Sequence, residues 1–357
     1  MTLGAARNSL ASAAVLTMML SAPCLSLAAE KGGRDTEVAG AELITSETQK
    51  AIDRGLQFLA RQQHDDGSFG SGGYSRNVAV CGLAGMAFMS GGSVAERGPY
   101  APQVARCLQF ILANCQDDGF IDVPGSSSHG PMYGHGFATL FLAETYGMSG
   151  KSHAEVRERL AKAVGLIVNT QNKEGGWRYQ PVRHEADISV TVCQIMALRA
   201  ARNAGIYVPR ETIDHCIEYV KKSQNPDGGF MYMSQGGQSA FPRSAAGVVA
   251  LYSAGIYEGP EIEKGLEYLS AFVPNRDTLG FNRETHYFYG HYYAVQAMWH
   301  AGDKHWRQWY PAIRDELLAR QRGDDGAWMD SICQEYGTAM ACIILQMPNN
   351  YLPIFQR

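Results

Sequence analysis

The sequence predicts an all-α protein in which six helical hairpins close into an (α/α)6 toroid. Three observations lead to this prediction: a glycine–aromatic motif recurs six times, a striped amphipathic helix precedes each copy, and a helix that is apolar on most faces follows it. Glycine accounts for 39 of 357 residues, above the usual ~7%, which agrees with a bend that needs glycine in every repeat.

The motif defines the period of the chain. Three copies, at 63–69, 171–177 and 224–230, fit the pattern Q-x3-G-x-[FW], and partial copies lie at 116–120, 277–281 and 321–328. The aromatic anchors at positions 69, 120, 177, 230, 281 and 328 are 47 to 57 residues apart. A period of this size indicates a repeat architecture in which each unit is one pair of elements.

The helices before the motif carry apolar residues at i, i+4 and i+7, so only one face of each is apolar. The five complete stripes are Ile52-Leu56-Leu59, Val104-Leu108-Ile111, Leu160-Val164-Ile167, Ile213-Ile217-Val220 and Ile262-Leu266-Leu269. The sixth stripe is weaker, with Ile313 and Leu317 followed by Arg320. A striped helix is half exposed, and these six therefore form the outer layer.

The helices after the motif are apolar on most faces, as buried helices are. They contain residues 81–88, 138–143, 192–198, 247–251, 294–299 and 339–345. Six hairpins with buried second helices can close with those helices lining a central barrel. We expect the motif glycine to end each outer helix in a left-handed or tight turn, and the glutamine and aromatic anchor to join neighbouring hairpins.

The chain divides into four parts. Residues 1–29 are typical of a secretory signal peptide, with Arg7, an apolar run from Leu10 to Leu20 and small residues at Ala28 and Ala29. A polar leader (30–46), the toroid (47–348) and a C-terminal tail (349–357) follow. We therefore expect a periplasmic or secreted protein. No later apolar stretch is long enough to cross a bilayer, so a membrane would be contacted only at its surface.

Composition excludes several function classes. The formal net charge is −4 and no basic cluster is present, which argues against nucleic-acid binding. After removal of the signal peptide seven cysteines remain, without a C-x-x-C spacing, so we expect buried thiols rather than a metal site or a disulfide framework. We expect no cofactor, since no phosphate-binding loop, dinucleotide fingerprint or H-E-x-x-H motif occurs.

Candidate site residues lie where loops lead into the inner helices. Tyr133-Gly134-His135 recurs as Tyr289-Gly290-His291, three repeats later, which in a six-membered ring is diametrically opposite. We expect the two Tyr/His pairs to face each other across the mouth of the toroid and to bind a polar group. The alternative is that the tyrosines pack and the histidines satisfy backbone groups.

The repeat is similar to the QW motif of the squalene and terpenoid cyclases, whose α/α toroids are shared with protein prenyltransferase β subunits. The resemblance covers residues 47–348 and implies the toroid fold. Squalene–hopene cyclases carry a D-x-D-D-T motif whose middle aspartate protonates the substrate. Asp187 and Thr191 match its ends, but Ser189 and Val190 replace the acids between them. Asp187 is thus a candidate acid or a simple helix N-cap.

The prenyltransferase resemblance implies a catalytic zinc held by an aspartate, a cysteine and a histidine. His291 resembles the histidine, but Arg243-Ser244-Ala245 offers no Asp-x-Cys, so zinc-dependent prenyl transfer is disfavoured. The candidate catalytic residues are Asp187, His135 and His291, with no metal ligand. The candidate substrate-binding residues are Tyr133, Tyr289, Tyr292, Arg243 and His184.

Three functions remain open at this point. The first is a terpenoid-cyclase-like or prenyltransferase-like toroid, an isomerase or transferase if it is an enzyme, that binds an apolar ligand of the isoprenoid class in its centre. The second is a polysaccharide lyase or hydrolase using Arg178, Arg183 or Arg243. The third is a non-enzymatic binding or scaffold module.

Overall fold

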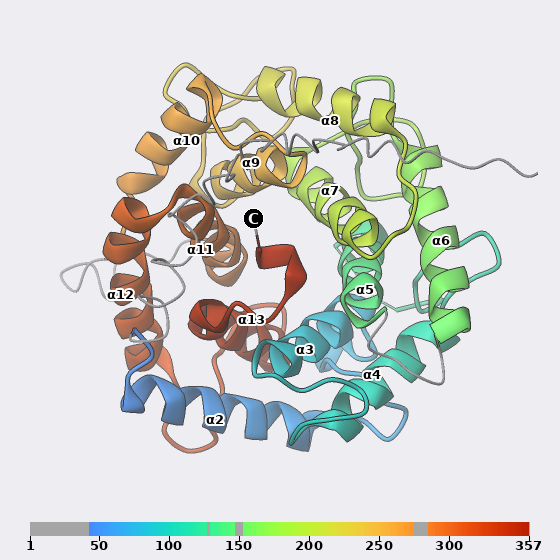
Figure 1. Cartoon of the computed structure of the whole chain (residues 1–357), viewed down its shortest axis with the longest axis vertical. Coiled ribbons are helices and arrows are strands. Elements are labelled where there is room, and N and C mark those ends of the chain that lie inside the picture. Colours follow the sequence, from blue (N-terminus) through green and yellow to red (C-terminus); the bar gives the residue numbers. More distant parts are fainter. Residues whose placement is uncertain (1–42, 127–128, 147–152, 275–284, 357) are drawn as a thin grey trace, which may run out of the picture.

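The computed structural model describes residues 43–126, 129–146, 153–274 and 285–356. This part of the chain forms twelve α-helices and no β-strand. The predicted signal peptide, most of the polar leader and the motif copy at 277–281 lie outside the described residues. The helices form two concentric rings (Figure 1), which confirms the predicted all-α toroid.

The inner and outer helices alternate along the chain. The inner ring consists of α3 (Val78–Ser90), α5 (Pro131–Thr145), α7 (Ile188–Asn203), α9 (Phe241–Ser253), α11 (Tyr287–Ala301) and α13 (Gln334–Gln346). The outer ring consists of α2 (Ser46–Gln62), α4 (Ala101–Ala113), α6 (His153–Thr170), α8 (Arg210–Lys222), α10 (Pro260–Ser270) and α12 (Asp303–Arg320). Each inner helix packs on the next, and α13 packs on α3, so the ring is closed.

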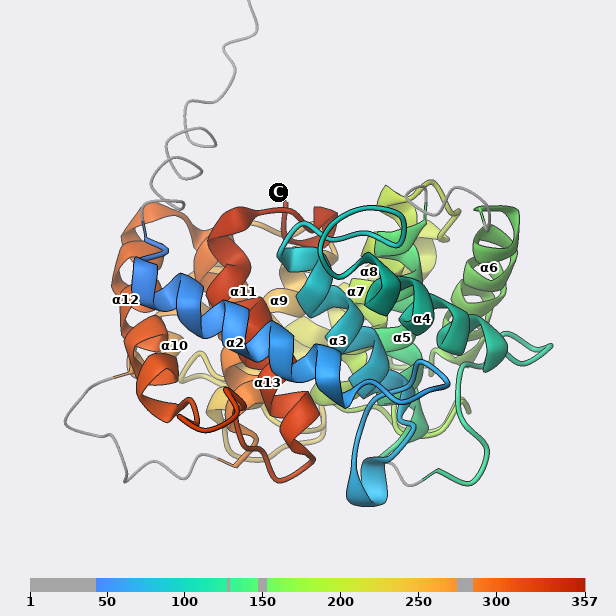
Figure 2. The same cartoon turned by 90° about the horizontal axis from the view of Figure 1, so that it is seen from below.

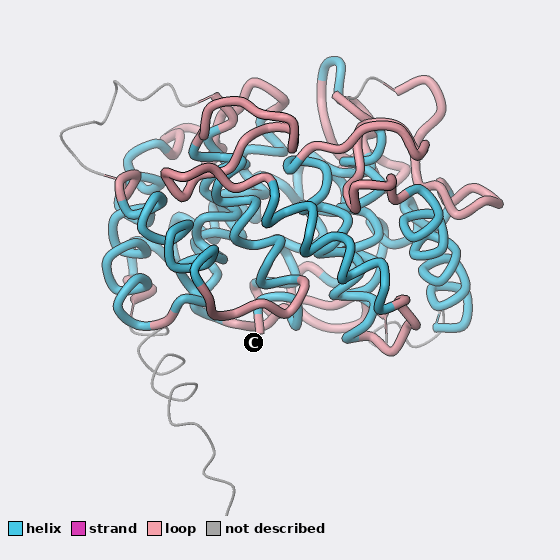
Figure 3. Tube along the Cα trace, turned by 90° about the horizontal axis from the view of Figure 1, so that it is seen from above, coloured by secondary structure: helices cyan, strands magenta, loops and turns pink. Residues whose placement is uncertain are grey.

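The hydrophobic pattern explains which helix takes which layer. In α2 the stripe residues Ile52, Leu56 and Leu59 are buried, while α3 buries nearly every residue. Seen from the side, the outer helix α2 passes obliquely in front of the inner helices α13 and α3 (Figure 2). Figure 3 shows the loops gathered at the two ends of the helices. In α12, whose stripe is weak, Trp306 and Trp309 supply the buried surface that the stripe lacks.

The motif glutamine is a clamp between neighbouring outer helices. Its side-chain amide donates to two carbonyls, one of the motif glycine and one in the first turns of the next outer helix. The pairs of acceptors are Gly67 and Gln103 for Gln63, Gly175 and Thr212 for Gln171, Gly228 and Glu261 for Gln224, and Gly326 and Ala51 for Gln321, at 2.8–3.0 Å. The bond from Gln321 to Ala51 joins the last repeat to the first and closes the outer ring.

The motif glycine is required by both conformation and space. Gly175 has φ 99°, a region that favours glycine, and a Cβ there would lie 2.0 Å from the carbonyl oxygen of His215 in α8. The equivalent glycines 67, 119 and 228 stand equally close to the backbone of the next outer helix. The outer helices end five or six residues before this glycine, α2 at Gln62 and α6 at Thr170, so the expectation that the glycine ends the helix is wrong. The glycine instead forms the turn that follows and lets the next outer helix approach.

The aromatic anchor joins the layers. Trp328 is buried, donates its indole N–H to Leu317 in α12 at 2.8 Å, and leaves room only for a glycine at position 55 of α2. Trp177 makes the corresponding bond to Ile167 at 2.7 Å. The predicted role of the glutamine in joining neighbouring hairpins is confirmed. The indole bonds of the anchors are made within their own hairpin, and of these two anchors Trp328 also packs against the next one, at Gly55.

The C-terminal tail lies on the axis of the ring, where Figure 1 shows it inside the inner helices. Trp299 of α11 donates to the Phe355 carbonyl at 3.1 Å, and Arg199 of α7 donates to the Gln356 carbonyl at 2.6 Å. The Ile354 N–H donates to the Glu144 carboxylate of α5 at 3.3 Å. These contacts are all near the C-terminal ends of inner helices, so the tail covers that end of the barrel.

A pair of glycine substitutions tests the clamp. Gly175→Ala places a methyl group against the His215 carbonyl and should lower the free energy of unfolding by about 3–5 kcal/mol. Gly205 has a similar φ of 81° but open space around a Cβ, so Gly205→Ala should cost only about 1–2 kcal/mol. Chemical denaturation followed by circular dichroism measures both; equal losses would contradict the close-approach role of Gly175.

Candidate functional site

The end of the barrel opposite the tail is formed by the N-terminal ends of the inner helices and the loops that lead into them. We call this end the mouth. Tyr133 and Tyr289 lie in the first turns of α5 and α11, and Asp187 is the N-cap of α7. The loops before the inner helices begin at the aromatic anchors, so the repeat itself brings polar residues to this end.

The two tyrosines of the recurring Tyr-Gly-His segment meet at the mouth. Their ring centroids are 6.5 Å apart in an edge-to-face arrangement, which is favourable for aromatic pairs. The Tyr289 hydroxyl donates to the Ser189 carbonyl at 2.7 Å, which fixes this ring against the start of α7. The structure thus brings Tyr133 and Tyr289 together, as their three-repeat separation predicts.

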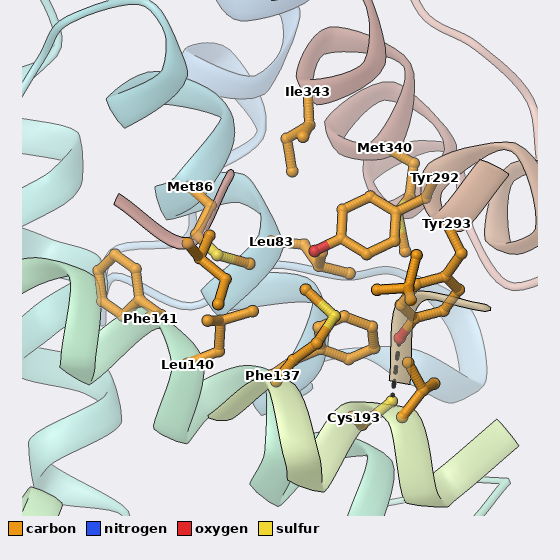
Figure 4. Packing of buried hydrophobic residues seen from close by; sticks show 14 of the residues in the cluster. Leu83, Met86, Phe137, Leu140, Phe141, Cys193, Tyr292, Tyr293, Met340 and Ile343 are labelled. Atoms are coloured by element: carbon orange, nitrogen blue, oxygen red, sulfur yellow. Dashed lines mark hydrogen bonds between the residues drawn. The ribbon is translucent and has the colours of Figure 1, made fainter. Parts of the chain in front are cut away.

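A continuous row of aromatic rings leads inward from this pair. Tyr289 contacts Tyr293 at 4.8 Å, Tyr293 contacts Tyr292 at 4.9 Å, and Tyr292 contacts Phe137 at 6.1 Å between ring centroids. Figure 4 shows the inner part of this row among apolar side chains such as Leu83, with the Tyr293 hydroxyl bonded to the Cys193 thiol at 3.3 Å. The row reaches the apolar centre of the toroid.

The row also continues outward. The ring of Tyr133 lies 6.1 Å from that of Tyr179, whose hydroxyl is hydrogen-bonded to that of Tyr232. The Arg178 guanidinium lies over both rings, 5.2 Å from Tyr179 and 5.9 Å from Tyr232, and forms an ion pair with Glu185. We call the six residues Tyr232, Tyr179, Tyr133, Tyr289, Tyr293 and Tyr292 the tyrosine column.

Asp187 is the buried acid beside this column. Its Oδ1 accepts the Val190 N–H at 2.9 Å, so the N-cap role is confirmed. The side chain is fully buried, and its second oxygen, Oδ2, has no hydrogen-bond partner among the described residues. Burial raises the pKa of Asp187 to about 6, although the Val190 N–H and the Arg178 charge act to lower it. Near pH 6 the group can therefore both donate and accept a proton.

The carboxylate acts on the column electrostatically. Burial raises the pKa of the Tyr133 and Tyr232 hydroxyls. The negative charge of Asp187 adds to this, directly after burial at Tyr133 and after the bond with the Tyr179 hydroxyl at Tyr232. The same charge contributes at Tyr289, after burial and two nearer groups. The three hydroxyls therefore stay protonated at neutral pH. The Tyr289 hydrogen is already donated to the Ser189 carbonyl, and the Tyr232 hydroxyl is bonded to that of Tyr179.

The structure does not bring the two histidines together. His135 is buried between layers, where Nδ1 accepts the Ile121 N–H at 3.2 Å and Nε2 bonds to the Ala163 carbonyl at 3.3 Å. Burial lowers its pKa to about 4, so it is neutral. His291 packs among Tyr287, Phe241 and Trp309. Residues i and i+2 of a helix point about 200° apart, so a tyrosine that faces the mouth turns its histidine outward.

The other predicted binding residues are dispersed. Tyr292 lies in the centre of the toroid as part of the tyrosine column. Arg243 is half-buried and donates to the Phe230 carbonyl at 3.1 Å and to the Gln238 carbonyl. His184 is exposed on the loop before α7. Arg243 and His184 are therefore not part of the tyrosine column.

Tyr179 and Tyr232 were missed by the sequence argument, although a signal for them exists. Each stands two residues after an aromatic anchor, at Trp177 and Phe230. In other repeats this position holds Ser71, Asp122 and Asp330. If the glycine–aromatic motif is extended by two residues beyond its aromatic anchor, it includes Tyr179 and Tyr232, the outer end of the tyrosine column.

A second group of acids lies on the α13 side of the mouth. Glu335 is buried and accepts the Ser71 hydroxyl at 2.9 Å. Asp330 accepts the Ile332 N–H at 2.8 Å, and burial raises its pKa. These carboxylates give this side of the mouth an acidic character.

Other site classes have little support in the described part of the chain. Seven free cysteines are present there, and no group of three or more His, Cys, Asp or Glu side chains could hold a metal ion. Within the same residues, no helix has both the length and the apolar character needed to cross a bilayer.

Comparison with known families agrees with this architecture. Residues 36–161 and 148–272 each match the prenyltransferase alpha-alpha toroid domain, and together they cover more than half of the chain. The chain belongs to this toroid family. No curated protein matches the chain significantly.

Solved structures of similar fold come from several enzyme classes. A substrate-bound variant of the type II terpene cyclase MstE from Scytonema aligns with a TM-score of 0.60 at 14% identity, over 86% of this chain and 98% of that one. A glycosidase aligns with 0.58 at 11%, over 88% and 99%. A D-mannose isomerase aligns with 0.57 at 12%, over 84% and 96%. At these identities the likeness shows the fold alone.

Thr191, which matches the last position of the D-x-D-D-T motif, has a structural role in this protein. Thr191 accepts the N–H of the anchor Trp177 at 3.1 Å, and Ser244 and Thr338 accept the N–H groups of Phe230 and Trp328 in the same way. Thr191 is therefore one of three residues that tie these anchors to their inner helices. Of the two matches to the D-x-D-D-T motif, Asp187 alone combines a structural role with an unpartnered oxygen.

The raised pKa of Asp187 predicts a pH-dependent stability. Between about pH 4 and pH 6 the folded state holds this proton and the unfolded state has lost it, so stability falls as pH rises. The shift corresponds to roughly 3 kcal/mol. Asp187→Asn keeps the capping oxygen and removes the titration, so its stability relative to wild type should rise by up to about 3 kcal/mol from pH 4 to pH 7. Denaturation curves at four pH values measure this, and parallel pH profiles for the two proteins would contradict it.

Proposed function

We propose that the protein is an exported toroid that binds an apolar ligand of the isoprenoid class, with the hydrocarbon chain in the ring and the polar end at the mouth. The observation that carries this proposal is the tyrosine column, which leads from the buried Asp187 to the apolar centre. A ligand that is apolar along its length and polar at one end fits both ends of this path.

The centre of the toroid suits a branched hydrocarbon. Leu83, Leu140 and Ile343 are buried there together with Met86 and Met340 (Figure 4). Methionine side chains are unbranched and flexible, so they can repack around a ligand at little cost. The aromatic faces of the column add favourable contact area along the path.

The position of the C-terminal tail indicates the end of the barrel at which a ligand would enter. Leu352, Ile354 and Phe355 are buried at the other end of the barrel, where the carbonyls of Phe355 and Gln356 accept bonds from inner helices. A ligand would therefore enter at the mouth. The mouth loops expose Val182 and Met329, each 57% accessible, which would favour contact with a membrane surface that supplies the ligand.

Two further observations support the proposal. The structure of the MstE variant, whose fold is similar, is a complex with geranylgeranyl dihydroxybenzoate as substrate, which supports a ligand of this class for the present chain. The signal-peptide features of residues 1–29 support export to the periplasm or the medium.

A polysaccharide lyase has less support. Such an enzyme needs a basic side chain that is free to take a proton, and the three candidate arginines are already engaged. Arg178 pairs with Glu185, Arg183 donates to the Asn169 carbonyl, and Arg243 donates to two loop carbonyls. The proposal is one of binding, since Ser189 and Val190 replace the inner acids of the cyclase motif.

Substitutions in the column test the proposal. Titration of the purified protein with geranylgeraniol, followed by calorimetry, should show saturable binding. Tyr133→Ala and Tyr289→Ala should each weaken it about tenfold, because each removes an aromatic contact of about 1–1.5 kcal/mol at the entrance.

Tyr207→Ala is the matched control, since this tyrosine is 82% exposed on the loop after α7, at the end of the barrel away from the mouth. It should leave the affinity unchanged. Absence of binding by wild type, or equal losses in all three variants, would overturn the proposal. Chromatography of the extracted ligand after incubation shows whether any conversion accompanies binding.

A further inference from the structure

We infer that the polar end of the ligand donates a hydrogen bond and carries no negative charge, so that the site takes an isoprenoid alcohol or phenol and rejects the corresponding diphosphate or carboxylate. This inference rests on the proposed function and specifies the class of its ligand. It follows from three features of the mouth. These are a hydrogen-bond acceptor without a partner, the negative charges around that acceptor, and the nearby arginines, which already have partners.

The unsatisfied acceptor is Oδ2 of Asp187. The side chain is fully buried, and Oδ2 has no partner within hydrogen-bond distance among the described residues, whereas Oδ1 is occupied by the Val190 N–H. The Tyr232 hydroxyl lies near enough to lower the pKa of this carboxyl slightly, without forming a bond to Oδ2. A buried acceptor without a partner is costly, and native proteins retain few of them. A hydroxyl group at this position would supply the missing donor.

The surrounding charges oppose an anion. Asp187 and Glu335 are both buried carboxylic acids at the mouth, and Asp330 lies close to Glu335 in sequence on the same side. The single hydroxyl that Glu335 engages is that of Ser71, at 2.9 Å. An incoming phosphate or carboxylate would be placed among groups of its own sign in a site of low dielectric, which is strongly unfavourable.

The arginines of the mouth loops are not arranged to bind an anion. Phosphates and carboxylates are usually recognised by guanidinium groups that offer two parallel donors. Here Arg178 is paired with Glu185 and stacked on two tyrosines, Arg76 is paired with Asp66 at 3.0 Å, and Arg243 donates to backbone carbonyls. Binding an anion would require one of these pairs to break.

The tyrosine column suits a neutral donor. The hydroxyls of Tyr133 and Tyr232 stay protonated and lie close enough to Asp187 to sense its charge. The Tyr133 hydroxyl can donate to the oxygen of an alcohol while that alcohol donates to Oδ2, which satisfies both hydrogen-bonding roles of a hydroxyl group.

The test uses one hydrocarbon chain with three polar ends: geranylgeraniol, geranylgeranoic acid and geranylgeranyl diphosphate. Calorimetric titration at pH 7.5 should give an affinity for the alcohol at least tenfold higher than for either anion. Asp187→Asn replaces one carboxylate oxygen by an amide donor and removes the charge, so the preference for the alcohol should fall to less than threefold.

Glu211→Gln is the control, because it removes one acid that is 82% exposed on the outer helix α8. The preference of this variant should equal that of wild type. If all three ligands fail to bind, the proposed function itself is wrong. If an anion binds as well as the alcohol or better, or if Asp187→Asn keeps the full preference while remaining folded by circular dichroism, only the head-group inference is overturned.

Discussion

The architecture depends on the clamp that the motif glutamine and glycine make between neighbouring outer helices. The glutamine amide bonds to two carbonyls at once, and the glycine lets the backbone of the next helix approach where a Cβ would collide with it. The clamp is made by Gln63, Gln171, Gln224 and Gln321, so it recurs around the ring. Gln321 bonds to Ala51, which joins the last repeat to the first and closes the ring around the inner helices.

The closure of the ring determines which residues lie at the mouth of the barrel. The inner helices begin at one end of the barrel, so the residues just after each aromatic anchor and at each helix start meet there. Tyr133 and Tyr289 come together from opposite repeats, whereas their companions His135 and His291 turn toward the outer layer. The tail covers the other end, and the tyrosine column lies beside the buried Asp187 at the mouth.

Period and helical pattern were enough to predict the ring, because the repeated glutamine makes the contact between neighbouring hairpins that was expected of it. The glycine does not end the outer helix but forms the turn after it, a difference that the motif alone did not reveal. The site was only partly predictable. The meeting of Tyr133 and Tyr289 followed from counting repeats, but the outward turn of the histidines required the helix phase, which the sequence argument did not apply. Asp187 proved to be both a cap and a buried acid, because only tertiary packing determines that its Oδ2 lacks a partner. The roles proposed for these residues in ligand binding stay predictions.

The central claim is that the tyrosine column guides an isoprenoid from the mouth into the ring. A crystal structure of the protein with a geranylgeraniol analogue, brominated next to its hydroxyl end, tests this most directly. The account predicts one anomalous bromine peak beside Asp187 and Tyr133, with the hydrocarbon chain among Leu83, Leu140 and Met340. A peak on the outer helices, or an unchanged apolar centre with no ligand at saturating concentration, would contradict it.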